Sequence, residues 1–407
     1  MRRWLSAAAL FALAAGAAAQ TIPSGEVGAY DVFPRAAIGT ARTVALGGAT
    51  GAVDPDGYEA VFANPAGMSG MAGTGLDFGS DGNTVDNVVV DLNNPKARSL
   101  DHPFKYSYGG VRYVTASGWG LGAAVQTPFN FNDEFRGTTR VVNGASSIIA
   151  TGDQNAIHTE GAAYELGAGR SFDDGKYGFG ASISYVTAET DYSFTPVLPS
   201  SAPFSRTAVG DAVSFGVGVL ARPYRWLRAG LFYKQGYRIP FADSLNTGLP
   251  VALNAFEDLR SPNRLTLGVR LAPYENLRFF FQGRVVFGMN DTFISGSGVF
   301  PTALGNTVAS GQAATLDGGW GVEYVPYDVE DLTVKFRAGG YFENTGIEGG
   351  YTRYHRTAGF AFEPWCFSLS MAIDDAEFYN NFVVGFGVDL LDVAKRTSKM
   401  YGWNLPL

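Results

Sequence analysis

Basic side chains recur at alternate positions of several strand-like segments in the second half of the chain. Inside an apolar cavity, such a cation could hold the negative head group of an amphipathic ligand, because an uncompensated charge is costly there. If the large apolar residues of these segments face outward, the alternation aims seven cations inward: Arg228, Lys234, Arg270, Arg278, Arg284, Lys335 and Arg337.

Apolar residues share the inward face with these cations. Phe232, Phe280 and Val286 have the same parity along their segments, and a lining that mixes rings with cations suits an amphipathic ligand better than a sugar. The candidate ligand-binding residues in the lumen are therefore Arg228, Phe232, Arg278, Phe280, Arg284 and Arg337. The alternative interpretation is that the cations pair with inward acids such as Glu165 and Glu323 in a structural network.

No group of residues predicts catalysis or metal binding. His102, His158 and His355 lie in different segments, without a neighbouring Ser or Cys motif and without metal-ligand spacing. The acidic turns at 54–57 and 173–175 do not complete a calcium-binding loop. We therefore expect no catalytic residues, no metal and no cofactor, and we predict that the protein is not an enzyme.

The segments that would position the inward residues follow a two-residue period. In 213–219 and 265–271, large apolar residues point one way, and small or polar residues point the other way. Many runs reach the ~9–11 residues that a tilted membrane strand needs. The pattern predicts about 14 antiparallel strands, at 74–90, 104–115, 118–128, 156–171, 177–194, 211–222, 225–239, 262–273, 276–290, 314–326, 330–343, 353–363, 365–374 and 380–390.

The connections between these strands alternate in length. Short Pro-containing turns at 222–225, 272–276 and 326–330 separate long connections at 129–155, 195–210, 242–261, 290–313 and 345–353. Transmembrane barrels have this arrangement, with short periplasmic turns and long outer loops. We therefore predict an all-β fold, a transmembrane β-barrel of about 14 antiparallel strands. A soluble β-sandwich, β-helix or propeller is the alternative, and no repeat of 20–50 residues supports a propeller.

Composition and targeting agree with a membrane barrel. Only 17% of the residues are charged, below the ~25% of ordinary soluble chains. Residues 1–19 have the basic start, apolar run and small-residue cleavage site of a secretory signal peptide; an N-terminal membrane helix is the alternative. A net charge of −8 without a long basic run argues against nucleic acid as a partner. We expect export to the outer membrane of a Gram-negative bacterium.

The region between the signal peptide and the first predicted strand, residues 20–73, lacks alternation and is rich in Gly, Ala and Pro. We predict that it forms a hatch, or plug, inside the lumen of the barrel, which spans residues 74–390. The residues proposed to form the gate are Gly47, Gly48, Asn64, Pro65, Ala66 and Gly67. Residues 391–407 are expected to form a C-terminal periplasmic extension, as a short helix or as a disordered tail.

Three stretches carry a resemblance to a known family. Residues 41–49, the pair Asp54 and Asp56, and residues 64–68 together resemble the N-terminal hatch of the FadL-type family of outer-membrane transporters for long-chain fatty acids and other hydrophobic compounds. Residues 336–341 and 357–360 are similar to late strands of that superfamily. It also includes shuttle barrels of type IX protein secretion, of the PorV type.

The resemblance implies passive uptake of hydrophobic small molecules that resemble long-chain fatty acids, through a barrel gated by its hatch. The alternative function is a shuttle or anchoring barrel, whose outer loops would bind secretion-system proteins. In either case the expected partners include outer-membrane lipid, lipopolysaccharide and the barrel-assembly machinery.

Overall fold

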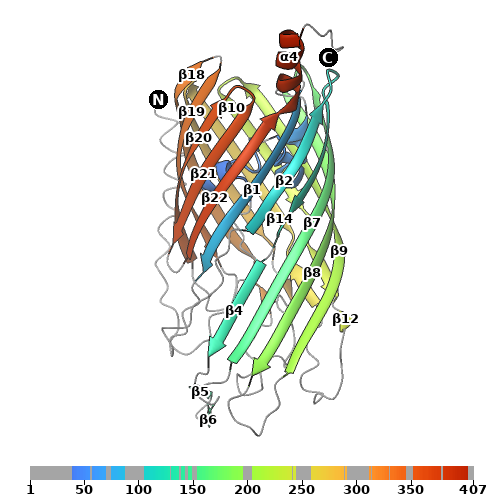
Figure 1. Cartoon of the computed structure of the whole chain (residues 1–407), viewed down its shortest axis with the longest axis vertical. Helices are drawn as coiled ribbons and strands as arrows, with labels where there is room; N and C mark the ends of the chain where they lie inside the picture. Colours follow the sequence, from blue (N-terminus) through green and yellow to red (C-terminus); the bar gives the residue numbers. More distant parts are fainter. Residues whose placement is uncertain are drawn as a thin grey trace.

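Fourteen strands form a closed antiparallel barrel (Figure 1). They are β1 (Gly75–Asn87), β2 (Lys105–Val114), β3 (Trp119–Gln126), β7 (Gln154–Phe172), β8 (Tyr177–Thr195), β9 (Phe204–Tyr224), β10 (Leu227–Lys234), β14 (Arg264–Tyr274), β15 (Leu277–Val286), β18 (Thr315–Val329), β19 (Leu332–Asn344), β20 (Thr352–Pro364), β21 (Phe367–Ala376) and β22 (Tyr379–Asp389). Each pairs with its neighbours in this order, and β22 pairs with β1. The predicted fold class is therefore confirmed.

The computed structural model describes a defined part of the chain, and all structural statements below refer to it. The described residues are 39–55, 57–69, 75–87, 105–128, 130–136, 139–142, 145–148, 154–195, 204–240, 242–243, 258–287, 289–290, 311–312, 314–329, 331–344, 352–376 and 379–401. The predicted signal peptide, the first part of the predicted hatch and residues 402–407 lie outside them.

Several strands differ from the predicted segments. The connection predicted at 129–155 contains β4 (Asn130–Arg136), which pairs with β7, and a hairpin of β5 (Thr139–Val142) and β6 (Ala145–Ile148). β9 begins inside the connection predicted at 195–210 and also pairs with β12 (Ala242–Asp243). Figure 1 shows β7, β8 and β9 extending beyond their neighbours. In these extended parts, backbone ladders pair segments whose sequences are polar and lack a clear alternation of apolar residues.

Two predicted strands are interrupted. The segment 225–239 ends as β10 at Lys234, where Asn263 Oδ1 accepts the Gly236 N–H at 2.8 Å, and resumes as β11 (Tyr237–Pro240), paired with β13 (Asp258–Ser261). The segment 276–290 ends as β15 at Val286, and β16 (Met289–Asn290) pairs separately with β17 (Gly311–Gln312). The first ladder is thus interrupted where the Asn263 side chain bonds to the backbone. The alternation of apolar and polar residues in the sequence does not reveal such a bond.

The outer face of the barrel is apolar. Large side chains such as Leu166 and Leu267 are 63% and 56% exposed, although their neighbours in sequence are buried or half-buried. This arrangement is the reverse of a soluble sheet, in which the exposed face is polar, and it fits a wall surrounded by lipid. Membrane barrels often carry outward aromatic residues near both membrane surfaces. Tyr108 and Tyr341 are instead buried on the inner face.

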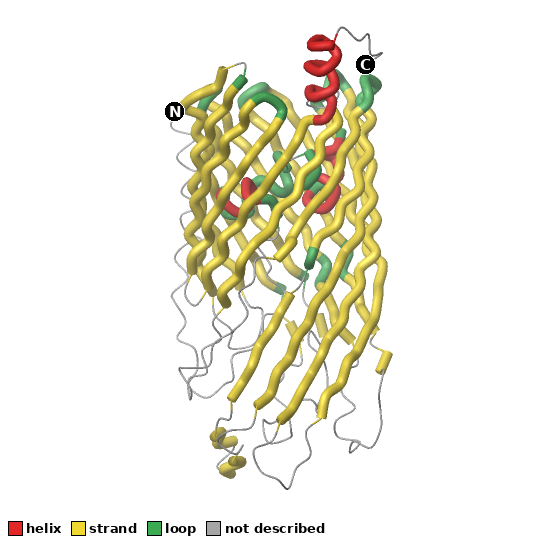
Figure 2. The backbone as a smooth tube through the Cα atoms, viewed as in Figure 1, coloured by secondary structure: helices red, strands yellow, loops and turns green. Residues whose placement is uncertain are grey.

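The N-terminal described residues, 39–55 and 57–69, form what we call the plug segment. It contains α2 (Ala41–Ala45), α3 (Ala60–Ala63) and the 3₁₀ helix η1 (Pro65–Met68). Figure 2 shows these short helices inside the barrel, in the half nearer α4. Most of the segment's residues are buried, and the others are half-buried. α2 begins at a polar cap, because the Thr40 side chain accepts a bond from Thr43 N at 3.3 Å.

One longer helix, α4 (Leu390–Tyr401), follows the last strand at the end of the barrel that carries the short turns. We call this the turn end and the opposite end the loop end. Arg396 ties the helix to the turn between β18 and β19, because it donates to Asp331 at 2.9 Å; it also donates to Asp392 of the same helix at 2.8 Å. Within the described residues, no helix combines the length and apolar character needed to cross a membrane.

Candidate functional site

The plug segment contacts the wall mainly through glycines. A Cβ at any of thirteen inward wall positions would come within 2.9 Å of a plug atom: Gly79, Gly110, Gly120, Gly122, Gly167, Gly169, Gly180, Gly218, Gly230, Gly319, Gly321, Gly339 and Gly359. The approach is closest between backbones, as at Gly120, where the added atom would lie 1.7 Å from the Met68 carbonyl oxygen. The inward face is therefore shaped to the plug segment, and a side chain at these positions would displace it.

Gly47 and Gly48, two of the proposed gate residues, form a left-handed turn after α2. Their φ angles are +61° and +71°, and Gly48 N donates to Thr43 O at 2.9 Å. The turn passes beside β18 and β19, where an atom added at Gly47 would lie 2.5 Å from the Gly340 carbonyl oxygen. Both the backbone conformation and the close approach therefore require glycine here.

The proposed gate residues 64–67 form the other end of the plug segment. Asn64 is fully buried and caps η1, because its Oδ1 accepts Ala66 N at 3.1 Å and its Nδ2 donates to Ala52 O at 2.6 Å. Pro65 and Ala66 occupy the first turn, and Gly67 packs on Pro55. The side-chain amide thus holds together two parts of the segment that are twelve residues apart.

Little space remains beside the Gly47–Gly48 turn. A cavity of about 10 Å³ is enclosed there, lined by residues including Gln282, Arg284 and Asp317. This volume corresponds to about one water molecule. Beside this turn, the plug segment thus packs closely against β15, β18 and β19.

A cluster of charges lies directly on the turn-end side of the plug segment, and we call it the charged arc. On three neighbouring strands, one inward residue touches the plug segment, and the next inward residue towards the turn end is an arginine. The pairs are Gly230 and Arg228 on β10, Gly268 and Arg270 on β14, and Phe280 and Arg278 on β15. The arc comprises Arg42, Arg228, Arg270, Arg278, Lys335, Arg337, Asp54, Glu323 and Glu363.

Asp54 connects the plug segment to two cations of the wall. Its carboxylate accepts from Arg42 at 2.9 Å, from Arg270 at 3.4 Å and from Arg228. Burial alone would raise the pKa of Asp54, but the three guanidinium groups outweigh it and hold the pKa well below its usual range. Asp54 is therefore an anion at every physiological pH.

Glu323 is the second anionic centre of the arc. Its side chain is completely buried and accepts from Arg278 at 2.8 Å, from Arg337 at 2.9 Å and from Arg42 at 3.3 Å. The strand register makes this possible, because Arg278 and Arg337 are both directly opposite Glu323, on β15 and β19. The candidate cations Arg278 and Arg337 are thus already paired within the wall.

The arc nevertheless retains unused positive charge. It contains six basic side chains and three carboxylates, an excess of three positive charges. Within the described residues, Arg337 Nη1, Arg228 Nε and Arg270 Nε are buried without a hydrogen-bond partner. Arg278 is 29% exposed, so that part of the arc is accessible to solvent. It could therefore bind an additional anionic group.

The structure separates the six predicted ligand-binding residues into two groups. Arg228, Arg278 and Arg337 belong to the arc, and Phe280 packs beside it on Leu46, with the Arg42 guanidinium 5.5 Å from the ring centre. Phe232 and Arg284 lie on the loop-end side of the plug segment, where Arg284 contacts Asp317 at 3.3 Å. All six point inward as predicted, and their part in ligand binding stays a prediction.

The alternative of a structural network also has support. Glu165 accepts from Lys234 at 2.6 Å and from Ser182, and Lys234 also contacts Ser184 at 2.5 Å. Asp54 and Arg42 were not predicted as charge partners. Both belong to the hatch-like stretches of the sequence, but their pairing depends on how the plug segment folds within the barrel. Within the described residues, no cluster of metal-ligating side chains is present.

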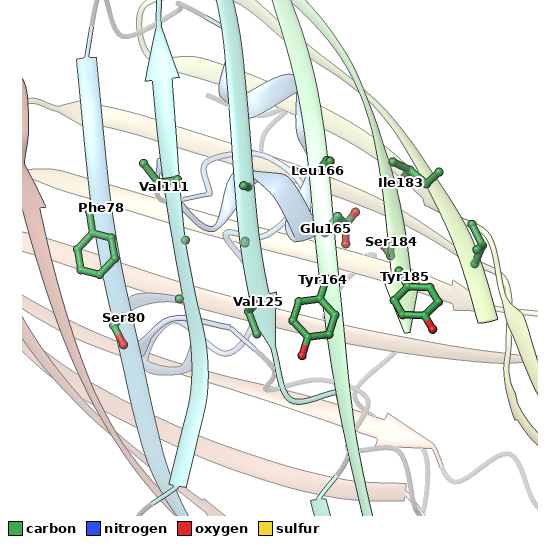
Figure 3. A pocket seen from close by; sticks show the side chains of 15 residues that line it. Phe78, Ser80, Val111, Val125, Tyr164, Glu165, Leu166, Ile183, Ser184 and Tyr185 are labelled. Carbon is green, nitrogen blue, oxygen red and sulfur yellow. The ribbon is translucent and has the colours of Figure 1, made fainter. Parts of the chain in front are cut away.

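A depression of about 680 Å³ lies on the outer face of the wall across β1, β2, β3, β7, β8 and β9 (Figure 3). Small residues on three neighbouring strands, including Gly109 and Ala123, form its floor, and Phe78 and Tyr164 stand at its edges, 42% and 51% exposed. Its lining is almost entirely apolar, which suits contact with lipid chains. The depression is thus distinct from the charged arc in the lumen.

Comparisons with known proteins agree on the fold. No protein-family model matches the sequence, and the comparison with curated proteins gives no match. Among solved structures, the Ralstonia pickettii toluene transporter TbuX has a TM-score of 0.58 and 16% identity, covering 88% of this chain and 99% of that chain. The Pseudomonas putida toluene transporter TodX has a TM-score of 0.54 and 15% identity, covering 88% and 99%.

A Pseudomonas aeruginosa FadL homologue has a TM-score of 0.53 and 10% identity, covering 86% of this chain and 98% of that chain. At these identities the comparison establishes the fold. The resemblance drawn from the hatch-like motifs is confirmed at that level, and the chain has the fold of the FadL-type outer-membrane barrel superfamily.

Proposed function

We propose that this chain is a channel in the outer membrane of a Gram-negative bacterium, through which hydrophobic small molecules with an acidic head group pass passively towards the periplasm. Long-chain fatty acids are the simplest members of this class. The fold supports transport of apolar molecules, because structures with the same fold are described as toluene transporters and as a monoaromatic hydrocarbon channel. No enzymatic step is part of this proposal.

The charged arc is the observation that favours an acidic cargo over a neutral one. A neutral aromatic hydrocarbon gains nothing from three excess positive charges, whereas a carboxylate leaving the plug segment would meet buried N–H groups without partners. The half-buried Arg278 is positioned to meet the head group on the turn-end side of the plug segment. The arc would thus compensate the head group while the apolar tail passes through the lumen.

Gating by the plug segment is the second part of the proposal. The cavity beside Gly47 has room for about one water molecule, and this close packing supports a movement of the segment when cargo passes. Where the segment contacts the wall through glycines, it could shift without rotamer changes in the wall. The gate would comprise Gly47, Gly48, Asn64, Pro65, Ala66 and Gly67.

Binding of radiolabelled oleate to the purified barrel in detergent micelles tests the acidic cargo. We expect Arg278→Gln to weaken oleate binding about three- to tenfold, corresponding to roughly 1 kcal/mol. Arg284→Ala, on the other side of the plug segment, should change binding less than about twofold. Arg170→Gln is the matched control, because Arg170 is an exposed cation beside Trp119 on the outer face. Absence of oleate binding by the wild-type barrel would overturn the proposed cargo.

A further inference from the structure

A second group of ionisable side chains is buried on the loop-end side of the plug segment, away from the charged arc. His355 of β20 lies between Glu343 of β19 and Asp374 of β21, and all three are at least 93% buried. Thr357, one inward position nearer the turn end, donates to the carbonyl oxygen of Ala45 in α2 at 3.0 Å. The group therefore lies next to the wall that supports α2.

Both ring nitrogens of His355 face carboxylate oxygens. Nδ1 lies 2.9 Å from Asp374 Oδ1, and Nε2 lies 3.3 Å from Glu343 Oε1. A neutral imidazole carries only one N–H, so that one of these contacts would bring a lone pair against a carboxylate oxygen. Such an unsatisfied contact is costly when it is buried. The geometry is satisfied when the ring carries two protons.

Two tyrosines pack on the imidazole and leave the charge balance of the group unchanged. Tyr341 stacks on the imidazole with 3.9 Å between ring centres, and its hydroxyl donates to Asp374 Oδ2 at 2.6 Å. Tyr379 of β22 meets the imidazole edge to face, with 5.0 Å between centres. Both phenols are neutral at pH 7, and they contribute no charge.

Arg353 supplies the other nearby cation. It lies 3.8 Å from Glu343, and its guanidinium carbon is 5.6 Å from the Tyr379 ring centre. With an imidazolium at His355, two cations balance the two carboxylates. With a neutral imidazole, a net negative charge would be buried inside the barrel wall, which is unfavourable.

We propose that His355, Asp374 and Glu343 form a proton-binding site. It holds His355 as an imidazolium at neutral pH, and the two charge-assisted hydrogen bonds join β19, β20 and β21 beside α2. The ligand is a single proton, shared among one imidazole and two carboxylates. Neither the proposed cargo nor the charged arc is needed for this inference.

The site gives the wall a dependence on pH. When the proton leaves, one of the two carboxylates loses its hydrogen bond from the imidazole, and His355 bridges to only one neighbouring strand. A proton bound more tightly in the folded barrel than in the unfolded chain stabilises the fold at lower pH, and this stabilisation is lost as pH rises. Ala372 and Val383 of the nearby wall pack on Ala41 and Val44 of the plug segment. Loss of the proton would therefore weaken the part of the wall on which α2 packs.

Nitrogen NMR of the purified barrel, labelled with ¹⁵N in its histidine rings, tests the site directly. The His102→Gln, His158→Gln double variant leaves His355 as the only labelled ring, because the chain has 3 histidines. We expect both ring nitrogens of His355 to carry protons at pH 7.5. Asp374→Asn should remove one of these protons at that pH. A neutral His355 tautomer at pH 7.5 in the double variant would overturn the proposal.

A second experiment distinguishes proton binding from a purely structural role of the ring. Urea midpoints are compared between pH 6 and pH 10 for the wild type and for His355→Gln, which cannot take up a proton. We expect the wild-type midpoint to fall more steeply with rising pH than that of the variant, by at least a factor of two. Parallel profiles would contradict a proton-binding role even if the variant were less stable throughout.

Discussion

Arg228 and Arg270 stand directly opposite each other on β10 and β14, and Asp54 of the plug segment bonds to both. Like charges in directly opposed positions repel, so that the wall alone would be destabilised here. The carboxylate of the plug segment removes the repulsion and becomes part of the wall's charge balance. Plug segment and barrel therefore depend on each other electrostatically as well as through packing.

The first prediction concerns the acid sensitivity of this contact. The guanidinium groups hold the pKa of Asp54 below its usual range, so that its contribution to stability is fully present above the unfolded pKa of ~3.9 and is lost as pH falls through the lowered folded value. The difference in unfolding free energy between wild type and Asp54→Asn should stay constant from pH 7 to about pH 5 and shrink below about pH 4. A difference that has already vanished at pH 5 would contradict this assignment.

Glu323→Gln provides the second prediction. The substitution removes the charge that Arg42, Arg278 and Arg337 share. Arg42 keeps Asp54, whereas Arg278 and the buried Arg337 lose their nearest carboxylate. We expect a loss of about 3–5 kcal/mol in the free energy of unfolding, measured by urea titration of the barrel in micelles.

The double variant Glu323→Gln, Arg337→Gln is the control for this charge imbalance. It removes one cation together with the carboxylate and should recover part of the lost stability. A single-variant loss below about 1 kcal/mol would mean that the buried pair contributes little.

Packing of the glycines on the plug segment gives the third prediction. A Cβ at Gly319 would lie 2.1 Å from the carbonyl oxygen of Gly47, and both atoms belong to backbones that cannot rotate away. Gly319→Ala should displace the plug segment, cost more than the ~1–3 kcal/mol of ordinary overpacking, and make residues 39–69 accessible to protease.

Gly283→Ala is the matched control, because an added Cβ there meets nothing within 4 Å. It should leave both the urea midpoint and the protease protection unchanged. Equal behaviour of the two variants would show that the close approach at Gly319 is not required for seating the plug segment.

Much of the barrel could be predicted because each strand carries its own period-two pattern. Phe232 and Arg278, for example, were placed on the inner face by parity alone. The pairing of Arg278 and Arg337 with Glu323 could not be predicted with the same detail, since it depends on the register between three strands. Strands β4 to β6 were missed because they lack an apolar face, and pair through backbone ladders outside the barrel.

The plug segment illustrates a different limit. Its Gly, Ala and Pro content indicated an irregular region within a lumen, but Arg42 and Asp54 gain their roles only through contacts with the wall. Likewise, His355, Glu343 and Asp374 each follow inward parity. Their meeting requires the alignment of β19, β20 and β21, which a single sequence does not specify.

Movement of the plug segment is tested by a disulfide to the wall, which is the fourth prediction. A Cβ at Gly268 would lie 3.2 Å from Ala52 Cβ, close to the spacing of a disulfide. In a Cys366→Ser background, oxidation of Ala52→Cys, Gly268→Cys should leave the barrel folded and reduce oleate uptake at least about tenfold, because the segment is held to the wall.

The control disulfide lies within the plug segment. A Cβ at Gly51 would be 3.8 Å from Ala63 Cβ, so that Gly51→Cys, Ala63→Cys joins two parts of the segment without fixing them to the wall. Uptake that recovers on reduction only in the wall-tethered variant supports a moving plug segment. Unchanged uptake in the oxidised wall-tethered variant would mean that cargo follows a path around it.

Uptake of labelled oleate and labelled toluene by cells that carry either the wild-type barrel or Arg278→Gln tests the central claim most directly. The account predicts that the wild type takes up oleate, and that the substitution lowers oleate uptake severalfold while toluene uptake stays within about twofold, because only the acid needs the excess charge of the arc. Equal loss of both uptake rates, or wild-type uptake of toluene without oleate, would contradict a channel for hydrophobic acids.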